Sequence, residues 1–188
     1  MRTRRHALGQ NFLHHKPTIE KITTTVKKRI LESTSKPKEI LEVGPGKLAL
    51  TKPLEAIADE LKLDLVLVER DRYLEDTIKD GAPNAELHFM DAATKLFPDL
   101  IDRLSEANRT PLFFASNLPY SASSQILANL CHRSRLVSGA VVMVQKELAQ
   151  RMAAKAGDSA RGALSLLIQT YFTVELDFDV GPGAFSPP

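Results

Sequence analysis

The sequence contains no tryptophan, a single cysteine and few aromatic side chains, which make up 6% of its 188 residues. With Cys131 as its one cysteine, the chain forms no internal disulfide bond, which is typical of a reducing compartment and predicts a cytoplasmic protein. No stretch approaches the roughly 20 apolar residues of a transmembrane helix, so the sequence predicts no contact with a membrane. The arginines at positions 2, 4 and 5 precede no apolar run, which argues against a secretory signal.

The overall composition is that of an ordinary globular domain. Apolar residues make up 43% and charged residues 26% of the chain, and the formal net charge is only +2. Such a small net charge neither requires nor excludes a nucleic-acid partner. The five histidines show no metal-ligand spacing, so no metal is expected. The length predicts one domain over residues 1–188, with a basic arm at residues 1–15, and we expect a monomer.

Apolar runs of strand length alternate with segments that have helical periodicity. Such an alternation predicts βαβ units, and therefore an α/β fold with a mostly parallel sheet covered by helices on both faces. The expected strands are 39–43, 63–69, 86–90, 112–116, 140–144 and 172–180, and the expected helices are 17–30, 53–61, 73–79, 98–107, 122–133, 147–156 and 163–170.

The tetrapeptide Asn117-Leu118-Pro119-Tyr120 directly follows the buried strand 112–116. Ligands of open α/β sheets bind at the carboxyl ends of the strands. Asn117 offers an amide that both donates and accepts, Pro119 fixes the backbone, and Tyr120 offers a flat aromatic face for a base. The tetrapeptide therefore indicates a clamp for a planar amine, and the exocyclic amino group of adenine fits it best.

A glycine turn, Gly44-Pro45-Gly46, follows the first strand of the predicted sheet. Without a Cβ, each glycine lets the backbone approach a ligand closely, although the same tripeptide also occurs as an ordinary turn. Lys47 is not in the frame of a phosphate-binding loop, and Ala49 occupies the third glycine position of a dinucleotide fingerprint. The turn therefore favours a ligand without a pyrophosphate group.

Acidic residues end the next two strands of the predicted sheet. Glu69 lies about as far beyond the glycines as the acid that binds a ribose in nucleotide-binding folds. Asp91 is placed to accept a hydrogen bond from an adenine amino group. Either acid alone is as well explained as a solvated charge, but the ordered series of features at successive strand ends favours an adenosine-containing cofactor. S-adenosylmethionine has no phosphates and fits the turn, and methyl transfer to nitrogen agrees with the amine clamp.

The sequence resembles the KsgA-type small-subunit rRNA adenine dimethyltransferases, which are relatives of the Erm large-subunit enzymes. The resemblance extends over essentially the whole chain. Its two most specific motifs are Gly-Gln-Asn-Phe-Leu at 9–13 and Asn-Leu-Pro-Tyr at 117–120. The motifs that recur in the same order are Gly9-Gln10-Asn11-Phe12-Leu13, Glu42-Val43-Gly44-Pro45-Gly46 with Leu50-Thr51, Glu69-x-Asp71, Asp91-Ala92, Asn117-Leu118-Pro119-Tyr120, Gln145-Lys146-Glu147 and Phe185-x-Pro187.

The resemblance implies the Rossmann-like fold of class I S-adenosylmethionine-dependent methyltransferases. It also implies transfer of methyl groups to N6 of two adjacent adenosines of small-subunit rRNA, within a 30S precursor. The cofactor site would then comprise Gln10, Asn11 and Leu13 from the arm, Gly44 at the methionine part with Gly46 beside it, Glu69 at the ribose, Asp91 at the adenine, and Asn117.

In the same family, the target adenine lies between two aromatic rings, here those of Tyr120 and Phe185. Asn117 and the Leu118 carbonyl would accept the two hydrogens of the target amine, while Pro119 holds the turn. No general base is required for this arrangement.

The sequence departs from the family pattern in three places. Ser121-Ala122-Ser123-Ser124 replaces the usual Asn-Ile-Ser-Thr after the tyrosine, and Leu48 stands where methyltransferases often have a third glycine. The sequence also ends at Pro188, before the last antiparallel strand and the helical domain of the family. A methyltransferase remains the favoured function, and the first and third departures support one alternative, a non-catalytic rRNA-binding assembly factor with a vestigial cofactor pocket. A nicotinamide oxidoreductase is a weaker alternative because the third glycine of the dinucleotide fingerprint is missing.

Overall fold

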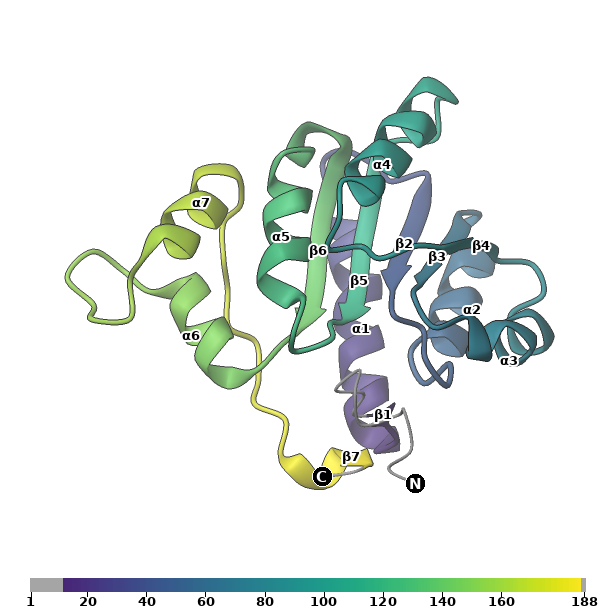
Figure 1. The fold of residues 1–188 in the computed structure, drawn as a ribbon, viewed down its shortest axis with the longest axis horizontal. Coiled ribbons are helices and arrows are strands. Elements are labelled where there is room, and N and C mark those ends of the chain that lie inside the picture. The colour runs from purple at the N-terminus through teal and green to yellow at the C-terminus, as the bar shows by residue number, and fades with distance from the viewer. Residues whose placement is uncertain (1–11, 187–188) are drawn as a thin grey trace.

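The computed structural model describes residues 12–186. Its centre is a sheet of five parallel strands in the order β4-β3-β2-β5-β6 (Figure 1). The predicted α/β fold with a mostly parallel sheet is therefore confirmed. The strands are β2 (Glu39–Val43), β3 (Asp64–Glu69), β4 (Glu86–Phe89), β5 (Leu112–Asn117) and β6 (Val137–Met143).

Helices cover both faces of this sheet, because the side chains of the central strands are apolar in both directions. On one face, α1, α2 and α3 pack against β2, β3 and β5, and on the other face α4, α5, α6 and α7 do so. Short 3-10 turns lie at Arg72–Leu74, Ser134–Leu136 and Pro182–Ala184. The helices are α1 (Lys16–Glu32), α2 (Thr51–Leu61), α3 (Glu75–Gly81), α4 (Leu96–Glu106), α5 (Ser123–Cys131), α6 (Lys146–Ala153) and α7 (Ala163–Tyr171).

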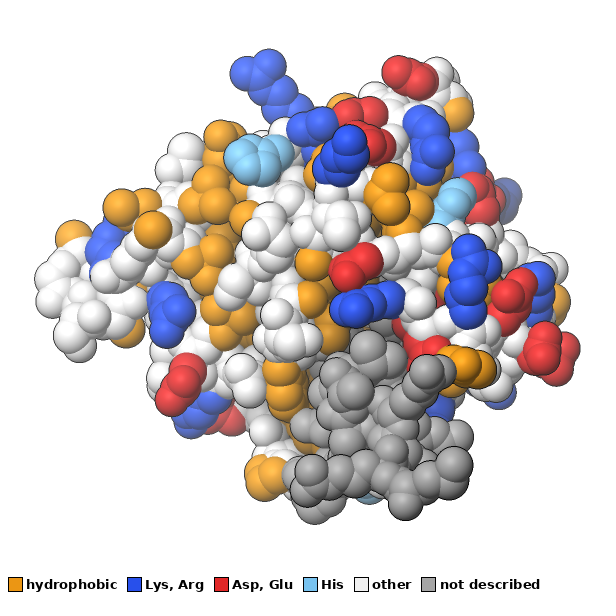
Figure 2. Space-filling view, in the orientation of Figure 1, with side chains coloured by type: hydrophobic (Ala, Val, Ile, Leu, Met, Phe, Trp, Pro, Cys, Tyr) orange, Lys and Arg blue, Asp and Glu red, His pale blue; other side chains and the backbone are white. Residues whose placement is uncertain are grey.

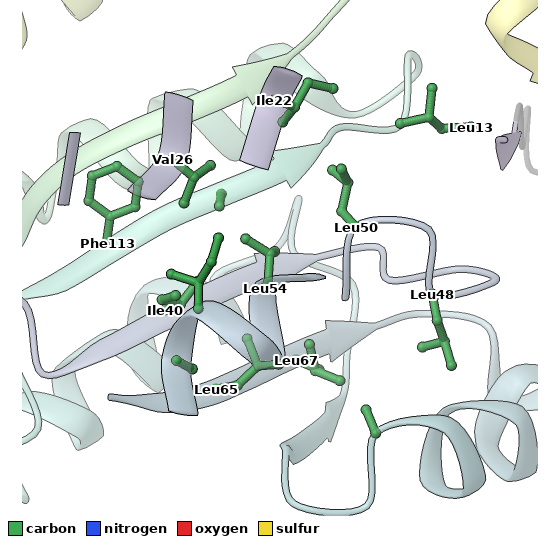
Figure 3. Packing of buried hydrophobic residues seen from close by; sticks show 14 of the residues in the cluster. Leu13, Ile22, Val26, Ile40, Leu48, Leu50, Leu54, Leu65, Leu67 and Phe113 are labelled. Atoms are coloured by element: carbon green, nitrogen blue, oxygen red, sulfur yellow. The ribbon is translucent and has the colours of Figure 1, made fainter. Parts of the chain in front are cut away.

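The two faces are filled by alternate residues of the same strands. Ile40 and Phe113 point towards the cluster that contains Val26 of α1 and Leu54 of α2 (Figure 3). Their neighbour Leu41 belongs to the cluster on the opposite face. Because successive side chains of a strand alternate between faces, an apolar run without polar interruptions is what a strand buried on both sides requires.

The strand order creates a crevice between β2 and β5. The chain adds β3 and β4 on one side of β2, then returns to place β5 and β6 on the other side. Backbone pairing of β2 with β5 ends at Leu41 and Phe114. Beyond that point the strands are joined by the Ser116 hydroxyl, which donates to the Val43 carbonyl at 2.5 Å. Such a reversal of strand order is where open α/β sheets bind ligands.

The opposite end of the sheet is closed by an ionic network. Arg109 donates to the buried carboxylate of Glu39 and, at 2.6 Å, to Glu86. These residues lie at the amino ends of β2 and β4, away from the crevice. The network therefore fixes the sheet without contributing to a ligand site at its carboxyl edge.

A second, two-stranded sheet joins the two ends of the described chain. In it, β1 (Phe12–Leu13) pairs antiparallel with β7 (Phe185–Ser186), and Leu13 lies opposite Phe185 (Figure 1). A further backbone bond runs from His14 N–H to the Ala184 carbonyl at 2.9 Å. Leu13 and Phe185 are both buried in the cluster on the α1 face, which anchors this small sheet.

The prediction of a strand over residues 172–180 is wrong. The segment has alternating side-chain burial, with Phe172, Val174 and Phe178 packed against the two apolar clusters. However, it forms no β-ladder in the described structure and is held by side chains, including Asp177, which accepts from the Thr25 hydroxyl of α1 at 2.9 Å. Alternating burial alone does not make a strand, because a strand needs a backbone partner.

Charged and apolar side chains are unevenly distributed over one face of the molecule. Basic and acidic side chains are intermixed towards α3 and α4, whereas apolar side chains are more prominent towards α6 and α7 (Figure 2). The exposed apolar residues near α7 are Leu166, Tyr171 and Leu176. None of the helices in residues 12–186 combines the length and the apolar character needed to cross a membrane.

Candidate functional site

A cleft lies at the carboxyl edge of the parallel sheet, over the crevice between β2 and β5. It is lined by the turn after β2, the ends of β3 and β4, and the segment after β5. Most of the residues selected from the sequence are thus brought together, although they are far apart along the chain. The predicted site residues that line the cleft are Leu13, Gly44, Gly46, Glu69, Asp91, Asn117, Leu118, Pro119 and Tyr120.

The glycine turn after β2 approaches the clamp closely. Gly44 has a φ of +74°, which favours glycine, and a Cβ on it would lie 4.0 Å from the Asn117 carbonyl oxygen and from Pro119. The Gly44 N–H donates to the Val68 carbonyl at 2.8 Å, which ties the turn to β3. A ligand in the cleft therefore meets backbone rather than side chain at this turn.

Gly46 makes room for an aromatic ring at the end of the same turn. A Cβ on Gly46 would lie 3.3 Å from Cε1 of Phe12, and Lys47 Nζ stands 4.5 Å from the centre of the Phe12 ring. Phe12 itself lines the cleft, as does its neighbour Leu13. Strand β1 thus forms one wall of the cleft. The predicted contributions of Gln10 and Asn11 lie outside the described residues.

Glu69 is buried and oriented by the backbone. Its Oε1 accepts hydrogen bonds from Arg70 N–H at 2.7 Å and Asp71 N–H at 2.8 Å, and its Oε2 accepts from Gly46 N–H at 3.3 Å. A carboxylate has about four lone-pair directions and three are used here, so acceptor capacity remains at Oε2 for a hydroxyl group of a ligand. The side chain is held in place before any ligand binds.

Asp91 is likewise held at the end of β4. Its Oδ1 accepts from Ala93 N–H at 3.0 Å, and its Oδ2 lies 3.2 Å from Nη1 of Arg70. The side chain is about one-third exposed at 32%. The carboxylate therefore faces the cleft with a defined orientation and with acceptor capacity for an amine.

The clamp is tied to the neighbouring strand and to the following helix. Leu118 is buried, and its N–H donates to the Met143 carbonyl of β6 at 3.0 Å. The hydroxyl of buried Ser123 donates to the Pro119 carbonyl at 2.8 Å. Within the segment 121–124, Ser123 is the residue that agrees with the family pattern, and it fixes the clamp in position.

Phe185 is the one described site residue that the structure does not bring into the cleft. It is buried in the apolar cluster on the α1 face and pairs with Leu13, which does line the cleft. Its ring therefore packs in the apolar core and is not part of the cleft lining that includes Tyr120. A stacking role for Phe185 stays a prediction of the resemblance.

Glu42 is a site residue that the sequence reasoning missed. It is buried in the wall of the cleft, and its Oε2 has no hydrogen-bond partner among the described residues. Burial raises the pKa of Glu42 to about 8; the neighbouring Thr51 hydroxyl acts in the opposite direction, and the Glu69 carboxylate has a smaller raising effect. Its signal in the sequence is an acidic residue inside an apolar strand, just before the glycine turn. An unpaired buried carboxyl is costly, so Glu42 marks a place for a cationic or hydrogen-bonding ligand group.

The unmodified protein is expected to become less stable as the pH rises, and replacing Glu42 with glutamine should abolish the part of this decrease in unfolding free energy that comes from Glu42. Because the pKa of about 8 in the folded protein exceeds the ordinary value of 4.5, the contribution of this carboxyl is fully present below about pH 4.5. It is lost as the pH rises towards 8, where the buried group must ionise. In this range the free energy of unfolding should fall by up to about 1.4 kcal/mol per pH unit.

Denaturant unfolding of the ligand-free protein and of Glu42→Gln, between about pH 5 and about pH 8, measures this effect. The difference between the two stability curves should grow with pH, because all other titrating groups are shared. Parallel curves would contradict a raised pKa at Glu42.

The described residues hold no group of three or more histidine, cysteine, aspartate or glutamate side chains arranged to bind a metal ion. Cys131 is buried in α5, and burial raises the pKa of its thiol to about 11. A thiol with so high a pKa carries little thiolate at neutral pH, which fits a packing role.

The fold is that of a Rossmann-like α/β protein with a cleft at the carboxyl edge of its sheet. The SAH-bound methyltransferase PaMTH1 of Podospora anserina has the same fold, with a TM-score of 0.52 at 11% identity over 84% of this chain and 65% of that one. Residues 1–188 match the family described as "Ribosomal RNA adenine dimethylase", and the chain belongs to that family.

Curated relatives agree with this family. "Ribosomal RNA small subunit methyltransferase A" of Pseudomonas savastanoi pv. phaseolicola is 37% identical over 98% of this chain. The protein of the same name from Geobacter sulfurreducens is 36% identical over 97% of the chain. The chain spans 64% and 63% of the lengths of these two relatives.

Proposed function

We propose that this chain binds S-adenosylmethionine and transfers methyl groups to N6 of two adjacent adenosines in small-subunit rRNA. One observation carries the proposal: the clamp Asn117–Tyr120, the glycine turn, Glu69 and Asp91 all line a single cleft at the point where the strand order reverses. Membership of the rRNA adenine dimethylase family and the names of the relatives support the substrate. A 30S precursor as partner, a monomeric state and a cytoplasmic location remain predictions of the sequence.

The residues of the cleft fit the proposed cofactor. Glu69 would accept a hydrogen bond from the ribose and Asp91 one from the adenine amino group, while the open backbone at Gly44 and Gly46 would admit the methionine part. The orphaned Glu42 carboxyl offers an acceptor for a cationic group at the same end of the cleft. When bound, S-adenosylmethionine supplies an electrophilic methyl group on a sulfonium centre.

The clamp would prepare the target amine for attack. The nitrogen of an adenine amino group is a poor nucleophile because its lone pair is delocalised into the ring. The Asn117 side-chain oxygen and the Leu118 carbonyl would accept its two N–H bonds and favour a tetrahedral nitrogen. Transfer then depends on positioning and on electrostatics rather than on a strong base.

The aromatic ring of Tyr120 would hold the extruded base. Tyr120 is half-buried at the mouth of the clamp and lines the cleft. Stacking of one base on one aromatic ring contributes about 1–3 kcal/mol, which offsets part of the cost of unstacking the adenine. Pro119 keeps the ring and the amide of Asn117 in a fixed relation, because its own backbone angle is restricted.

Transfer of a radiolabelled methyl group to 30S particles that lack the modification tests the proposal. The chain should label small-subunit rRNA in the presence of S-adenosylmethionine, and particles that already carry the methyl groups should take up no label. Binding of rRNA and cofactor without transfer would instead support the non-catalytic assembly factor. Failure to bind the cofactor at all would overturn the proposal.

A further inference from the structure

Helix α5 connects the two ends of the cleft. At its first turn, Ser123 bonds to the Pro119 carbonyl through both its hydroxyl, at 2.8 Å, and its N–H, at 3.0 Å. In the middle of the helix, Ile126 lines the cleft and packs in the same apolar cluster as Ala92, which follows Asp91. One rigid element therefore contacts both the clamp and the segment after β4.

Asn129 makes the polar part of the second contact. Its Nδ2 donates to the Ala92 carbonyl at 3.0 Å and to the Thr94 carbonyl at 3.2 Å. Its Oδ1 accepts from Gln125 Nε2, one turn earlier in the helix, at 3.1 Å. Asn129 is only 8% exposed, so its three hydrogen bonds are made away from water. Asparagine is unfavourable inside a helix, which makes this fully bonded placement informative.

The loop that Asn129 holds carries Asp91. Strand β4 is at the edge of the sheet, so no further strand supports the loop that follows it. Within the loop, Asp91 accepts from Ala93 N–H, and the Thr94 hydroxyl donates to the Asp91 carbonyl at 2.7 Å. The loop is therefore a small folded turn, and the two carbonyls bonded by Asn129 fix it relative to α5.

We propose that Asn129 is a positioning residue for the purine end of the cleft: it fixes Asp91 for the amino group of the cofactor's adenine and couples this loop to the clamp through α5. The inference rests on the proposed cofactor. Asn129 touches neither ligand directly in this scheme, since its side chain is occupied by the Ala92 and Thr94 carbonyls. Its effect reaches the base amine through the orientation of Asp91.

Asn129→Asp is the sharpest test. The change keeps the size of the side chain but replaces the donating NH2 group by a carboxylate oxygen that faces two carbonyl oxygens. We expect the Kd for S-adenosylhomocysteine to rise about tenfold in calorimetry, which corresponds to about 1.4 kcal/mol. Gln125→Ala is the matched control: it removes only the bond to Oδ1 from an exposed position and should leave the Kd within about twofold.

A ligand without the base amine separates positioning from general loosening of the fold. S-inosylhomocysteine carries a carbonyl oxygen in place of the amino group, so it offers Asp91 no donor at that position. Its Kd should rise by less than about threefold in Asn129→Asp. An equal rise for both ligands, or no rise for either, would overturn the inference.

A second variant tests the inference in case the Asn129→Asp protein does not fold. Asn129→Ser removes both bonds to the loop without adding a charge, and it should show the same dependence on the base amine with a smaller magnitude. If the unmodified chain binds neither ligand, the proposal that is rejected is the cofactor. If it binds both but Asn129→Asp shows no dependence on the base amine, the proposal that is rejected is the role of Asn129. The two failures are thus distinguishable.

Discussion

Replacing Asn117 with alanine is expected to lower the rate of methyl transfer by at least about 10²–10³-fold, the effect of removing one well-placed polar group from a reacting centre. In the proposed mechanism, the Asn117 oxygen accepts a hydrogen from the target amine and makes its lone pair available. Alanine has no acceptor at that position. The loss should appear in kcat, measured with saturating rRNA and cofactor.

The fold of the Asn117→Ala protein should remain intact. The residues that fix the clamp are Leu118, whose N–H bonds to Met143, and Ser123, whose hydroxyl bonds to Pro119. Neither bond involves the Asn117 side chain. Ser124→Ala, an exposed change on the following helix, serves as the matched control and should keep full activity. A rate within about tenfold of the unmodified protein would contradict the role given to Asn117.

Replacing Glu69 with glutamine should weaken binding of S-adenosylhomocysteine about 100-fold. A hydrogen bond to a charged group is worth about 1.5–3 kcal/mol, and loss of one ribose bond near the upper end of this range, about 2.7 kcal/mol, corresponds to about 100-fold in Kd. Glutamine has one acceptor oxygen, and that oxygen is needed by the N–H groups of Arg70 and Asp71, which lie 2.7 and 2.8 Å from Glu69 Oε1. Its NH2 group would then face the ribose and cannot accept a hydrogen bond from a hydroxyl.

Calorimetry with S-adenosylhomocysteine measures this change directly. The matched control is Glu60→Gln, which removes a surface carboxylate paired with Lys27 and is expected to leave the Kd unchanged. A thermal unfolding curve without ligand checks that the Glu69→Gln protein is folded. An unaltered Kd in a folded Glu69→Gln protein would exclude Glu69 as the ribose acid.

The central strands and the cleft were predictable because their signals are local. The run 112–115 is apolar on both faces, and Ile40, Leu41 and Val43 supply apolar side chains to both faces of the first strand, as a strand covered on both sides requires. Parallel strands place their carboxyl ends at one edge, so Glu69 and Asn117 could be expected together without any knowledge of the intervening packing.

Contacts that depend on distant partners were not predictable in the same way. The ladder between Leu13 and Phe185 joins the two ends of the described chain through two residues on each side, too few to leave a pattern. The segment 172–180 has the alternation of a strand, but no backbone partner lies beside it in the described structure. Asn129 looks like any polar residue in a helix until the carbonyls that it bonds are placed next to it.

The buried Glu42 shows a further reason for such gaps. A carboxyl inside an apolar strand contradicts the burial that the rest of the strand predicts, and local reasoning passes over it as an exception. Exceptions of this kind are expected at functional sites, where an unfavourable residue is retained for a ligand. Its position next to the glycine turn is the signal that would have identified it.

The turn after β2 also contains a residue in a backbone conformation that favours glycine. Leu48, at the third-glycine position, has a φ of +68° and a buried side chain. A Cβ on Gly81, at the end of α3, would lie 2.1 Å from Cδ1 of Leu48. Glycine at position 48 would relieve the backbone but leave a void, whereas a larger residue at position 81 would force the end of the Leu48 side chain to move. The two sites are therefore coupled, and a leucine at position 48 is accommodated most easily by a chain that carries glycine at position 81.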